Sequence, residues 1–431
     1  MGKFLSTIRK PLPRLDDVLP TRVRVILLIL ASLVPTIYVA KHYDPPPHFS
    51  KLIFFGRNKA ALALPEVNAL KLERDSVAGY DAQFYAQVAI HPLLTDPHMK
   101  TALDMPPYRS RRILLPAMAY LLGLGNPRLI LEAYALLNLV FWFALLFGMV
   151  RYLKAESPRD YLCIFAAVFT TGSMVSLERA LTDMPACTLL FYSAALGATA
   201  ATGALMLAVL ARETSALCLV RFAWPLPQSP REWLVLAGRT AIVLAPMVLW
   251  VAYITHVFGK ANNDTHPFVA PFAGWIKYMQ NAWFNFTHVT WQIMPTPPLL
   301  SWSEALRHPG KQWSRIWWHV RPYIADTTNQ ERVVFELIAP LSLLAQAIYF
   351  ACFRSLQSPY WRLGVIFSIM MICMNTSEEQ VAYCRAVLPV TLAFNIELRQ
   401  ARGWTFALFF LAGNLGLMWG FRDALAYCLF K

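Results

Sequence analysis

The strongest constraint on this chain is a series of long apolar stretches separated by short basic segments, as at residues 25–40 and 129–150. About 20 apolar residues cross the hydrocarbon core of a bilayer, and lipid leaves the backbone no option but a helix. The composition agrees, with 57% hydrophobic and 15% charged residues, against about 45–50% and about 25% in soluble domains. These features predict an all-α polytopic membrane protein with about ten transmembrane helices and two long outer-face loops, and exclude a soluble enzyme, a coiled coil and a disordered chain.

The distribution of positive charge predicts the orientation in the membrane. The net charge is +14, but the basic residues lie in short clusters between apolar stretches, which is typical of cytoplasmic loops and argues against a nucleic-acid partner. A basic segment at residues 1–24 precedes the first apolar stretch. We therefore expect a retained signal anchor, a cytoplasmic N-terminus, and a multi-pass protein of the bacterial inner membrane or the endoplasmic reticulum.

Four regions follow from this pattern. They are the basic N-terminus (1–24), a membrane module (25–257) that includes a first outer loop (41–112), a second outer loop (258–334), and C-terminal transmembrane helices (335–431). The number of crossings within 184–222 stays open. The second loop holds seven of the fourteen tryptophans, which is typical of an interfacial belt, with stacking on sugar rings as the alternative. Its histidines, like His256, show no metal-ligand spacing, so no zinc site is predicted.

Two short apolar segments lie in the first loop and directly after it. Residues 81–91 place apolar side chains on one helical face, which predicts an amphipathic helix lying on the membrane surface. Residues 113–124 are apolar but too short to span, which predicts a dipping or interfacial helix.

The densest group of reactive side chains also lies in this loop. The run Gly79-Tyr80-Asp81-Ala82-Gln83-Phe84-Tyr85 is followed by Tyr108-Arg109-Ser110-Arg111-Arg112. Arginine binds phosphate bidentately, and a single carboxylate can act as a base towards an acceptor hydroxyl when the leaving group is a phosphate. This combination suits transfer from a lipid-linked phosphosugar. The alternatives are that Asp81 is a helix N-cap and that the arginines contact lipid headgroups.

The pattern Tyr80-Asp81-x-Gln-Phe-Tyr, with Arg111-Arg112 and Pro116 leading into the next apolar helix, resembles the GT-C superfamily of membrane glycosyltransferases. It is most similar to the GPI mannosyltransferase-like branch and related bacterial proteins. The Glu178…Asp183 turn and the run Ala211-Arg212-Glu213-Thr214 also resemble that branch. The resemblance covers roughly residues 20–260.

The resemblance implies an inverting transfer of a sugar from a polyprenyl-phosphate donor to a lipid, glycan or protein acceptor on the outer face. It implies that Asp81 is the catalytic base. The residues expected to bind substrate are Tyr80, Gln83, Tyr85, Arg111, Arg112, Glu178, Asp183, Arg212 and Arg385. No cofactor is certain, and because the chain lacks a paired-acid signature, a need for a divalent cation (Mg²⁺ or Mn²⁺) stays open.

Several of these polar residues have structural alternatives. Arg179 and Asp183 are four residues apart and suit a local ion pair. Arg212 and Glu213 lie within an apolar stretch and point to different faces, so each is expected to have its own partner. Glu378, Glu379 and Arg385 lie in an outer turn, where simple solvation of the loop is the alternative to phosphate binding.

Two other functions compete with the transferase. A polysaccharide polymerase or ligase acting on diphosphate-linked glycans would depend on Arg315, Arg321 or His319 of the second loop. A lipid flippase or transporter would perform no chemistry, but transporters often carry internal repeats and midplane polar residues, and the sequence shows neither.

Overall fold

The computed structural model describes residues 15–43, 49–70, 72–74, 78–259, 268–288, 304, 329–375 and 380–430. In these residues the regular structure is helical, and Phe268 and Met374 form an isolated antiparallel bridge. The fold class predicted from the sequence, an all-α chain, is therefore confirmed for the described residues.

The helices between Thr21 and Ala195 include those of the first outer loop. In order they are α2 (Thr21–Lys41), η1 (Phe49–Ile53), η2 (Ala60–Leu62), α3 (Pro65–Ala69), α4 (Ala82–Ile90), α5 (Met99–Ala102), α6 (Pro106–Arg109), α7 (Leu114–Leu122), α8 (Pro127–Tyr152), α9 (Pro158–Val168), α10 (Thr171–Glu178) and α11 (Asp183–Ala195).

The remaining helices are mostly apolar. They are α12 (Ala198–Ala211), η3 (Glu213–Arg221), α13 (Pro230–Phe258), α14 (Ala273–His288), α17 (Asn329–Cys352), α18 (Pro359–Cys373), α19 (Gln380–Ala386), α20 (Leu388–Leu398), α21 (Gly403–Asn414), η4 (Leu415–Leu417) and α22 (Trp419–Phe430).

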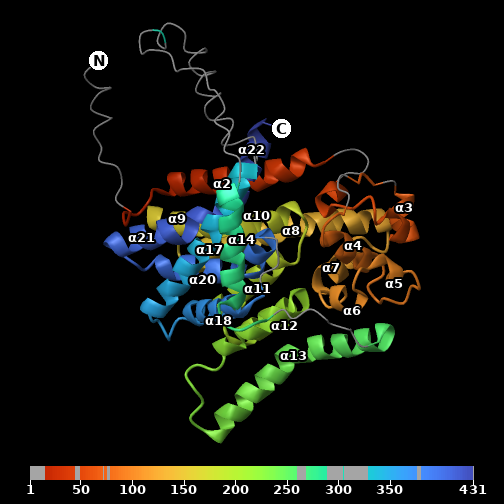
Figure 1. Cartoon of the computed structure of the whole chain (residues 1–431). Helices are drawn as coiled ribbons and strands as arrows, with labels where there is room; N and C mark the ends of the chain where they lie inside the picture. The colour runs from red at the N-terminus through yellow and green to blue at the C-terminus, as the bar shows by residue number, and fades with distance from the viewer. Residues whose placement is uncertain are drawn as a thin grey trace.

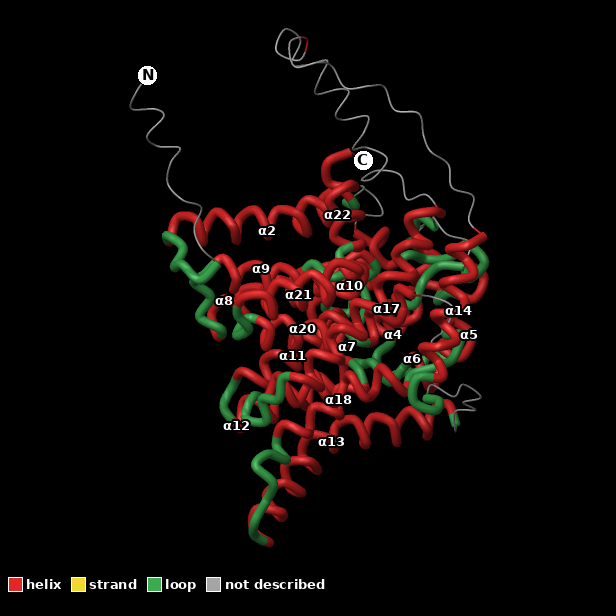
Figure 2. The backbone as a smooth tube through the Cα atoms, turned by 60° about the vertical axis from the view of Figure 1, so that its left-hand side comes forward, coloured by secondary structure: helices red, strands yellow, loops and turns green. Residues whose placement is uncertain are grey.

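Four helical segments are long and apolar enough to cross a membrane: Thr21–Lys41, Pro127–Tyr152, Pro230–Phe258 and Arg332–Cys352. Two bent pairs, Pro158–Val168 with Thr171–Glu178 and Gly403–Leu417 with Trp419–Leu429, raise the total to six if each pair is one span. The described residues thus form a helical structure with four to six candidate membrane spans, which is consistent with an α-helical membrane protein. In Figures 1 and 2, α2 and α13 lie at opposite edges of the helix assembly, and in Figure 1 the helices α3–α6 gather at one side.

The first outer loop folds into a small packed unit around α4. All nine residues of α4 are buried, so the prediction of an amphipathic helix on the membrane surface is wrong. The two glutamines of α4 explain the difference. Gln83 accepts a hydrogen bond from the Gly56 backbone N–H at 3.0 Å, and Gln87 accepts one from Leu64 at 2.8 Å and donates to the Ala102 carbonyl at 2.9 Å. Each glutamine satisfies loop backbone groups that would otherwise be buried without partners.

The apolar segment after this unit forms a short helix, as predicted. Helix α7 has nine residues and ends at Gly123, and Asn126 then caps α8 by accepting hydrogen bonds from the N–H groups of Arg128 and Leu129. A Cβ at Gly123 would lie 2.5 Å from the Ile130 nitrogen. The small residue therefore allows α7 to turn back tightly against α8, which brings the first outer loop next to the membrane helices.

Between α20 and α21, two buried asparagines form a reciprocal pair. Asn395 donates to the Asn414 side-chain oxygen at 2.9 Å, and Asn414 donates back at 3.0 Å. Both residues are buried. Because a buried amide without a partner is costly, this pair fixes the register of the two helices.

We expect Asn395→Ala to lower the free energy of unfolding by about 1–2 kcal/mol, because it leaves the Asn414 amide without its partner. The measurement is thermal unfolding of the detergent-solubilised protein, followed by tryptophan fluorescence. The double substitution Asn395→Leu with Asn414→Leu should recover part of the loss, since neither amide then remains. An unchanged melting temperature in Asn395→Ala would contradict this role.

Candidate functional site

The candidate site is centred on Asp81, at the junction between a loop and the first turn of α4. Gly79, two residues earlier, has φ of +74°, and a Cβ there would lie 2.6 Å from the Gly56 nitrogen. Glycine is thus required for both the backbone conformation and the close approach of two loops. Asp81 occupies the N-cap position of α4, but its side chain makes no capping hydrogen bond. The carboxylate is therefore directed to other partners.

Those partners are two arginines from distant parts of the chain. Arg109 Nη1 lies 2.9 Å from one Asp81 oxygen, and Arg385 Nη2 lies 3.2 Å from the other. Burial opposes ionisation of Asp81, but the positive charges of Arg109 and Arg385 outweigh it and hold the pKa of this carboxyl below its ordinary value. Asp81 is therefore ionised at neutral pH and paired on both sides.

The ion pairs continue beyond Asp81. Arg109 Nε also contacts Asp104 at 2.8 Å, and on the other side Arg385 approaches Asp183 at 3.7 Å. Asp183, which is buried at the start of α11, is in direct contact with Arg212.

The residue that follows Arg212, Glu213, forms a further ion pair nearby. Arg112 contacts Glu213 at 3.4 Å and donates hydrogen bonds to the hydroxyls of Tyr85 and Tyr108 at 2.5 and 2.9 Å. We call the eight charged residues of these ion pairs the charged cluster: Asp81, Asp104, Arg109, Arg112, Asp183, Arg212, Glu213 and Arg385. With four acidic and four basic members, its formal charge is zero.

The ring of Tyr80 borders this cluster and links it to a further arginine. The guanidinium carbon of Arg385 lies 5.1 Å from the ring centroid, and that of Arg179 lies 4.7 Å from it. Arg179 also stacks on Phe54 at 4.3 Å. Among the described residues, Arg179 forms no ion pair, so it adds positive charge beside the cluster that the cluster does not neutralise.

The structure brings together most of the residues predicted to form the site. Tyr80, Asp81, Tyr85, Arg112, Asp183, Arg212 and Arg385 all belong to the charged cluster or contact it. Three predicted residues are not joined to it by a described hydrogen bond or ion pair. Gln83 binds loop backbone. In the described part of the chain, one buried carboxylate oxygen of Glu178 has no hydrogen-bond partner, and the half-buried Arg111 has no side-chain bond.

The structural alternatives raised by the sequence have mixed outcomes. The local ion pair between Arg179 and Asp183 does not form, because Asp183 pairs with Arg212 and Arg385 instead. Arg385 is buried rather than solvated in a loop. The expectation of separate partners for Arg212 and Glu213 is confirmed.

Arg109 belongs to the arginine run noted in the sequence but not to the expected substrate-binding residues, and Asp104 was not expected at the site. Their spacing of five residues around Pro106-Pro107 was the available signal, because a short turn returns the chain and lets the guanidinium reach Asp104 through two hydrogen bonds. Other residues weighed from the sequence, namely Glu378, Glu379, Arg315, Arg321, His319 and five of the seven tryptophans in 258–334, lie outside the described residues.

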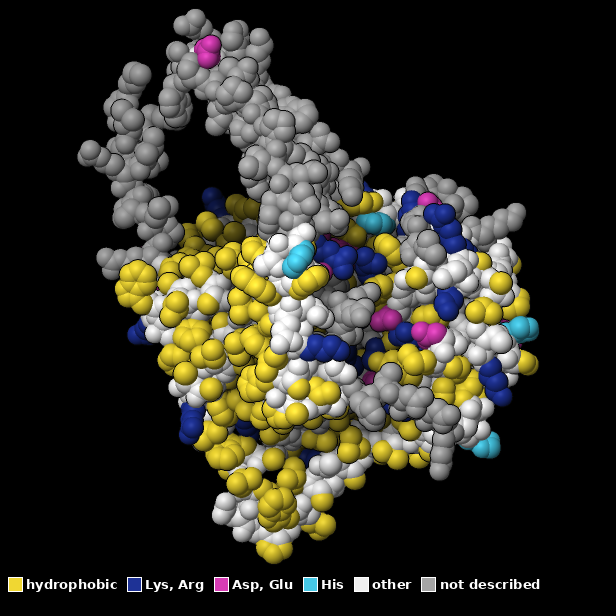
Figure 3. Space-filling view, in the orientation of Figure 1, with side chains coloured by type: hydrophobic (Ala, Val, Ile, Leu, Met, Phe, Trp, Pro, Cys, Tyr) yellow, Lys and Arg dark blue, Asp and Glu magenta, His cyan; other side chains and the backbone are white. Residues whose placement is uncertain are grey.

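In the view of Figure 3, charged side chains gather at one side of the molecular surface. Apolar side chains cover much of the left-hand part of the face in Figure 3, and charged side chains gather to the right of its centre, towards the side where Figure 1 draws α3–α6. This arrangement fits an apolar body within lipid and a polar unit at its boundary.

Comparison with known proteins gives no match to any protein-family model, curated protein or solved structure.

We expect the stability contribution of ionised Asp81 to disappear in acid. Since its folded pKa lies below the ordinary value of about 3.9, the contribution is present above that value and is lost as the pH falls through the folded pKa. Thermal unfolding of wild type and Asp81→Asn should therefore show a difference that shifts against the wild type between about pH 5 and pH 2. Glu156→Gln corrects for the loss of one exposed negative charge, and a pH-independent difference would contradict the assigned pairing.

Proposed function

We propose that the chain is a membrane glycosyltransferase of the GT-C type. It transfers a sugar from a polyprenyl-phosphate donor to a lipid, glycan or protein acceptor on the outer face of the membrane, with inversion at the anomeric carbon. The observation that supports this most directly is the setting of Asp81. Its ionised carboxylate lies between Arg109 and Arg385, next to a tyrosine ring on which a further arginine stacks.

The arginines around Tyr80 suit the phosphate of the donor. The charged cluster is neutral by itself, so a phosphate needs additional positive charge, and Arg179 on the Tyr80 ring supplies it. Arginine binds phosphate in a planar, bidentate manner. A phosphate near Tyr80 would meet Arg179 and would compete with Asp81 for Arg385, which contacts both the Tyr80 ring and the Asp81 carboxylate.

This competition gives Asp81 its catalytic role. A carboxylate held by two guanidinium groups is a weak base, because their positive charges lower its pKa. When the donor phosphate takes over Arg385, the pKa of Asp81 rises, and the carboxylate becomes able to accept the proton of the acceptor hydroxyl. The acceptor oxygen then bonds to the anomeric carbon from the face opposite the phosphate, and the bond between that carbon and the phosphate oxygen breaks. The leaving polyprenyl phosphate needs no proton at neutral pH.

The membrane placement that goes with this proposal has about ten spans. The long candidate helices would be completed by the shorter apolar helices α12, α18 and α20. The basic N-terminus would lie in the cytoplasm and the unit around α4 outside, at headgroup depth, where the phosphate of a membrane-anchored donor must lie.

We expect Asp81→Asn to lower turnover by a factor of at least about 10²–10⁴, because it removes the base while keeping the size of the side chain. The assay incubates purified protein with a panel of polyprenyl-phosphate sugars and a membrane-lipid extract, and measures release of free polyprenyl phosphate. Binding of the donor should persist. An Asn variant that turns over at the wild-type rate would contradict the assignment.

We expect Arg179→Gln to raise the KM for the donor about tenfold or more with a smaller effect on kcat, because a charge-assisted contact to phosphate is worth about 1.5–3 kcal/mol. Arg179→Lys should restore part of the affinity. The matched control is Arg151→Gln, an exposed arginine at the far end of α8. Equal KM values in Arg179→Gln and the control would show that this arginine does not bind the donor.

The same assay separates the two alternatives. A polymerase or ligase would release polyprenyl diphosphate from diphosphate-linked glycans and would be insensitive to Asp81→Asn. A flippase would move the lipid from one leaflet of a vesicle membrane to the other without releasing polyprenyl phosphate.

A further inference from the structure

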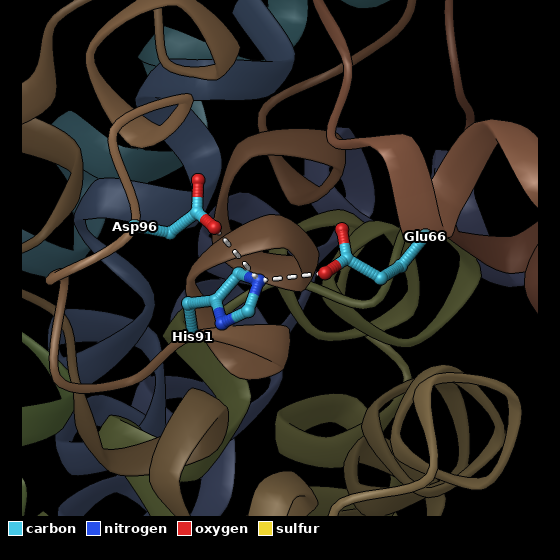
Figure 4. A group of neighbouring side chains, drawn as sticks. All are labelled: Glu66, His91 and Asp96. Atoms are coloured by element: carbon cyan, nitrogen blue, oxygen red, sulfur yellow. Dashed lines mark hydrogen bonds and ion pairs between the residues drawn. The ribbon is translucent and has the colours of Figure 1, made fainter.

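A second group of side chains with metal-binding chemistry lies at the opposite end of α4 from Asp81. Glu66 of α3, His91 directly after α4, and Asp96 of the following loop point towards one another (Figure 4). Their ligand atoms all lie within 4.8 Å of one another. We call Glu66, His91 and Asp96 the α4 triad. Since nine residues of helix rise by about 14 Å, the triad lies well away from Asp81.

The distances within the triad match those between ligands of one small cation. His91 Nε2 lies 3.0 Å from Glu66 Oε1 and 3.8 Å from Asp96 Oδ2. Ligands about 2.0–2.1 Å from a tetrahedral zinc ion are separated from one another by about 3.3 Å. These two distances bracket that value, and no two ligand atoms of the triad are more than 4.8 Å apart, so a cation requires the Glu66 and Asp96 carboxylates to move closer together by no more than about 1.5 Å.

One carboxylate oxygen of the triad lacks a described hydrogen-bond partner. Glu66 Oε2 is buried and has no hydrogen-bond partner among the described residues. A buried carboxylate oxygen without a partner is costly, and a neutral or protonated His91 contacts only the other oxygen. His98, which is not part of the triad, holds Asp96 in position. Asp96 Oδ1 accepts a hydrogen bond from the His98 backbone N–H at 2.7 Å and lies 3.0 Å from Nδ1 of the His98 ring.

From this geometry we infer that Glu66, His91 and Asp96 bind one first-row divalent metal ion, with Zn²⁺ as the best match. The imidazole ligand favours such ions over Mg²⁺ and Ca²⁺, which prefer oxygen ligands alone. The ion has three protein ligands and leaves a position for water. It fastens the C-terminal end of α4 to α3 and to the loop at Asp96, and so holds the helix whose other end carries Asp81.

No sequence motif signals this site. The ligands are separated by 25 and 5 positions and come from three different segments, so they lack the close spacing of common zinc motifs. The fold of the first outer loop around α4 is what brings them together.

The test uses the full-length protein in detergent, purified through a tag without histidine and stripped with a chelator. Zn²⁺ is then titrated by calorimetry, with bound metal counted by mass spectrometry and thermal unfolding followed by tryptophan fluorescence. We expect one Zn²⁺ per chain above any weaker sites, with micromolar affinity or better, and a rise in melting temperature on binding. His91→Gln and Asp96→Asn should each weaken this site at least tenfold and abolish the thermal shift.

Glu73→Gln is the matched control, since Glu73 is an exposed acid of the same loop that pairs with Lys51 and not with the triad. It should bind zinc like the wild type. The proposal is overturned if wild type binds no zinc or if the variants bind it as wild type does. The triad is then only a contact of His91 with two carboxylates. Because Asp96 is partly exposed, Asp96→Asn keeps the test valid even if a change at His91 disturbs folding.

Discussion

Neutralisation of buried charge is the constraint on which the rest of this structure depends. Ionised side chains next to lipid or within a packed core lose the stabilisation that water gives them, at a cost of several kcal/mol each unless they are paired. The charged cluster meets this constraint by pairing four acids with four arginines, which come from α6, α11, η3 and α19 and from the segments between helices. Breaking one pair would leave a buried charge without its counter-ion, so the ion pairs hold these segments together.

The same neutrality shapes what the site can bind. A neutral cluster has little affinity for an anion by itself, but its pairs can be exchanged. Arg385 contacts two carboxylates and a tyrosine ring, which makes it the member best placed to change partner. Arg179 stands beside it on the same ring without an ion pair of its own in the described part of the chain. The proposed donor phosphate would therefore bind by replacing one carboxylate, which couples binding to activation of Asp81.

The sequence predicted those parts of the structure that depend on local composition. The all-helical class follows from the apolar stretches, and the grouping of Asp81, Tyr85 and Arg112 follows from the charged and aromatic residues crowded into one loop. Separate partners for Arg212 and Glu213 follow from their adjacent positions in the chain, and in the structure the extended backbone of Arg212 between α12 and η3 directs the two side chains apart. Each of these predictions needs only the sequence within a few residues, or the cost of a charge in lipid.

What the sequence did not predict depends on packing between distant segments. The periodicity of α4 resembles that of a surface helix, because its glutamines count as polar, yet they bind loop backbone inside a packed unit. Likewise the pairing of Arg109 with Asp81, 28 positions away, depends on how the first loop folds. The α4 triad has the same origin.

The most direct test of this account is a cryo-electron microscopy map of the protein with a bound polyprenyl phosphate, compared with a map without it. The account predicts density for the phosphate beside Tyr80, within hydrogen-bond distance of Arg179 and Arg385, and a lengthened contact between Arg385 and Asp81. A phosphate bound elsewhere, with both arginine contacts to Asp81 intact, would contradict it.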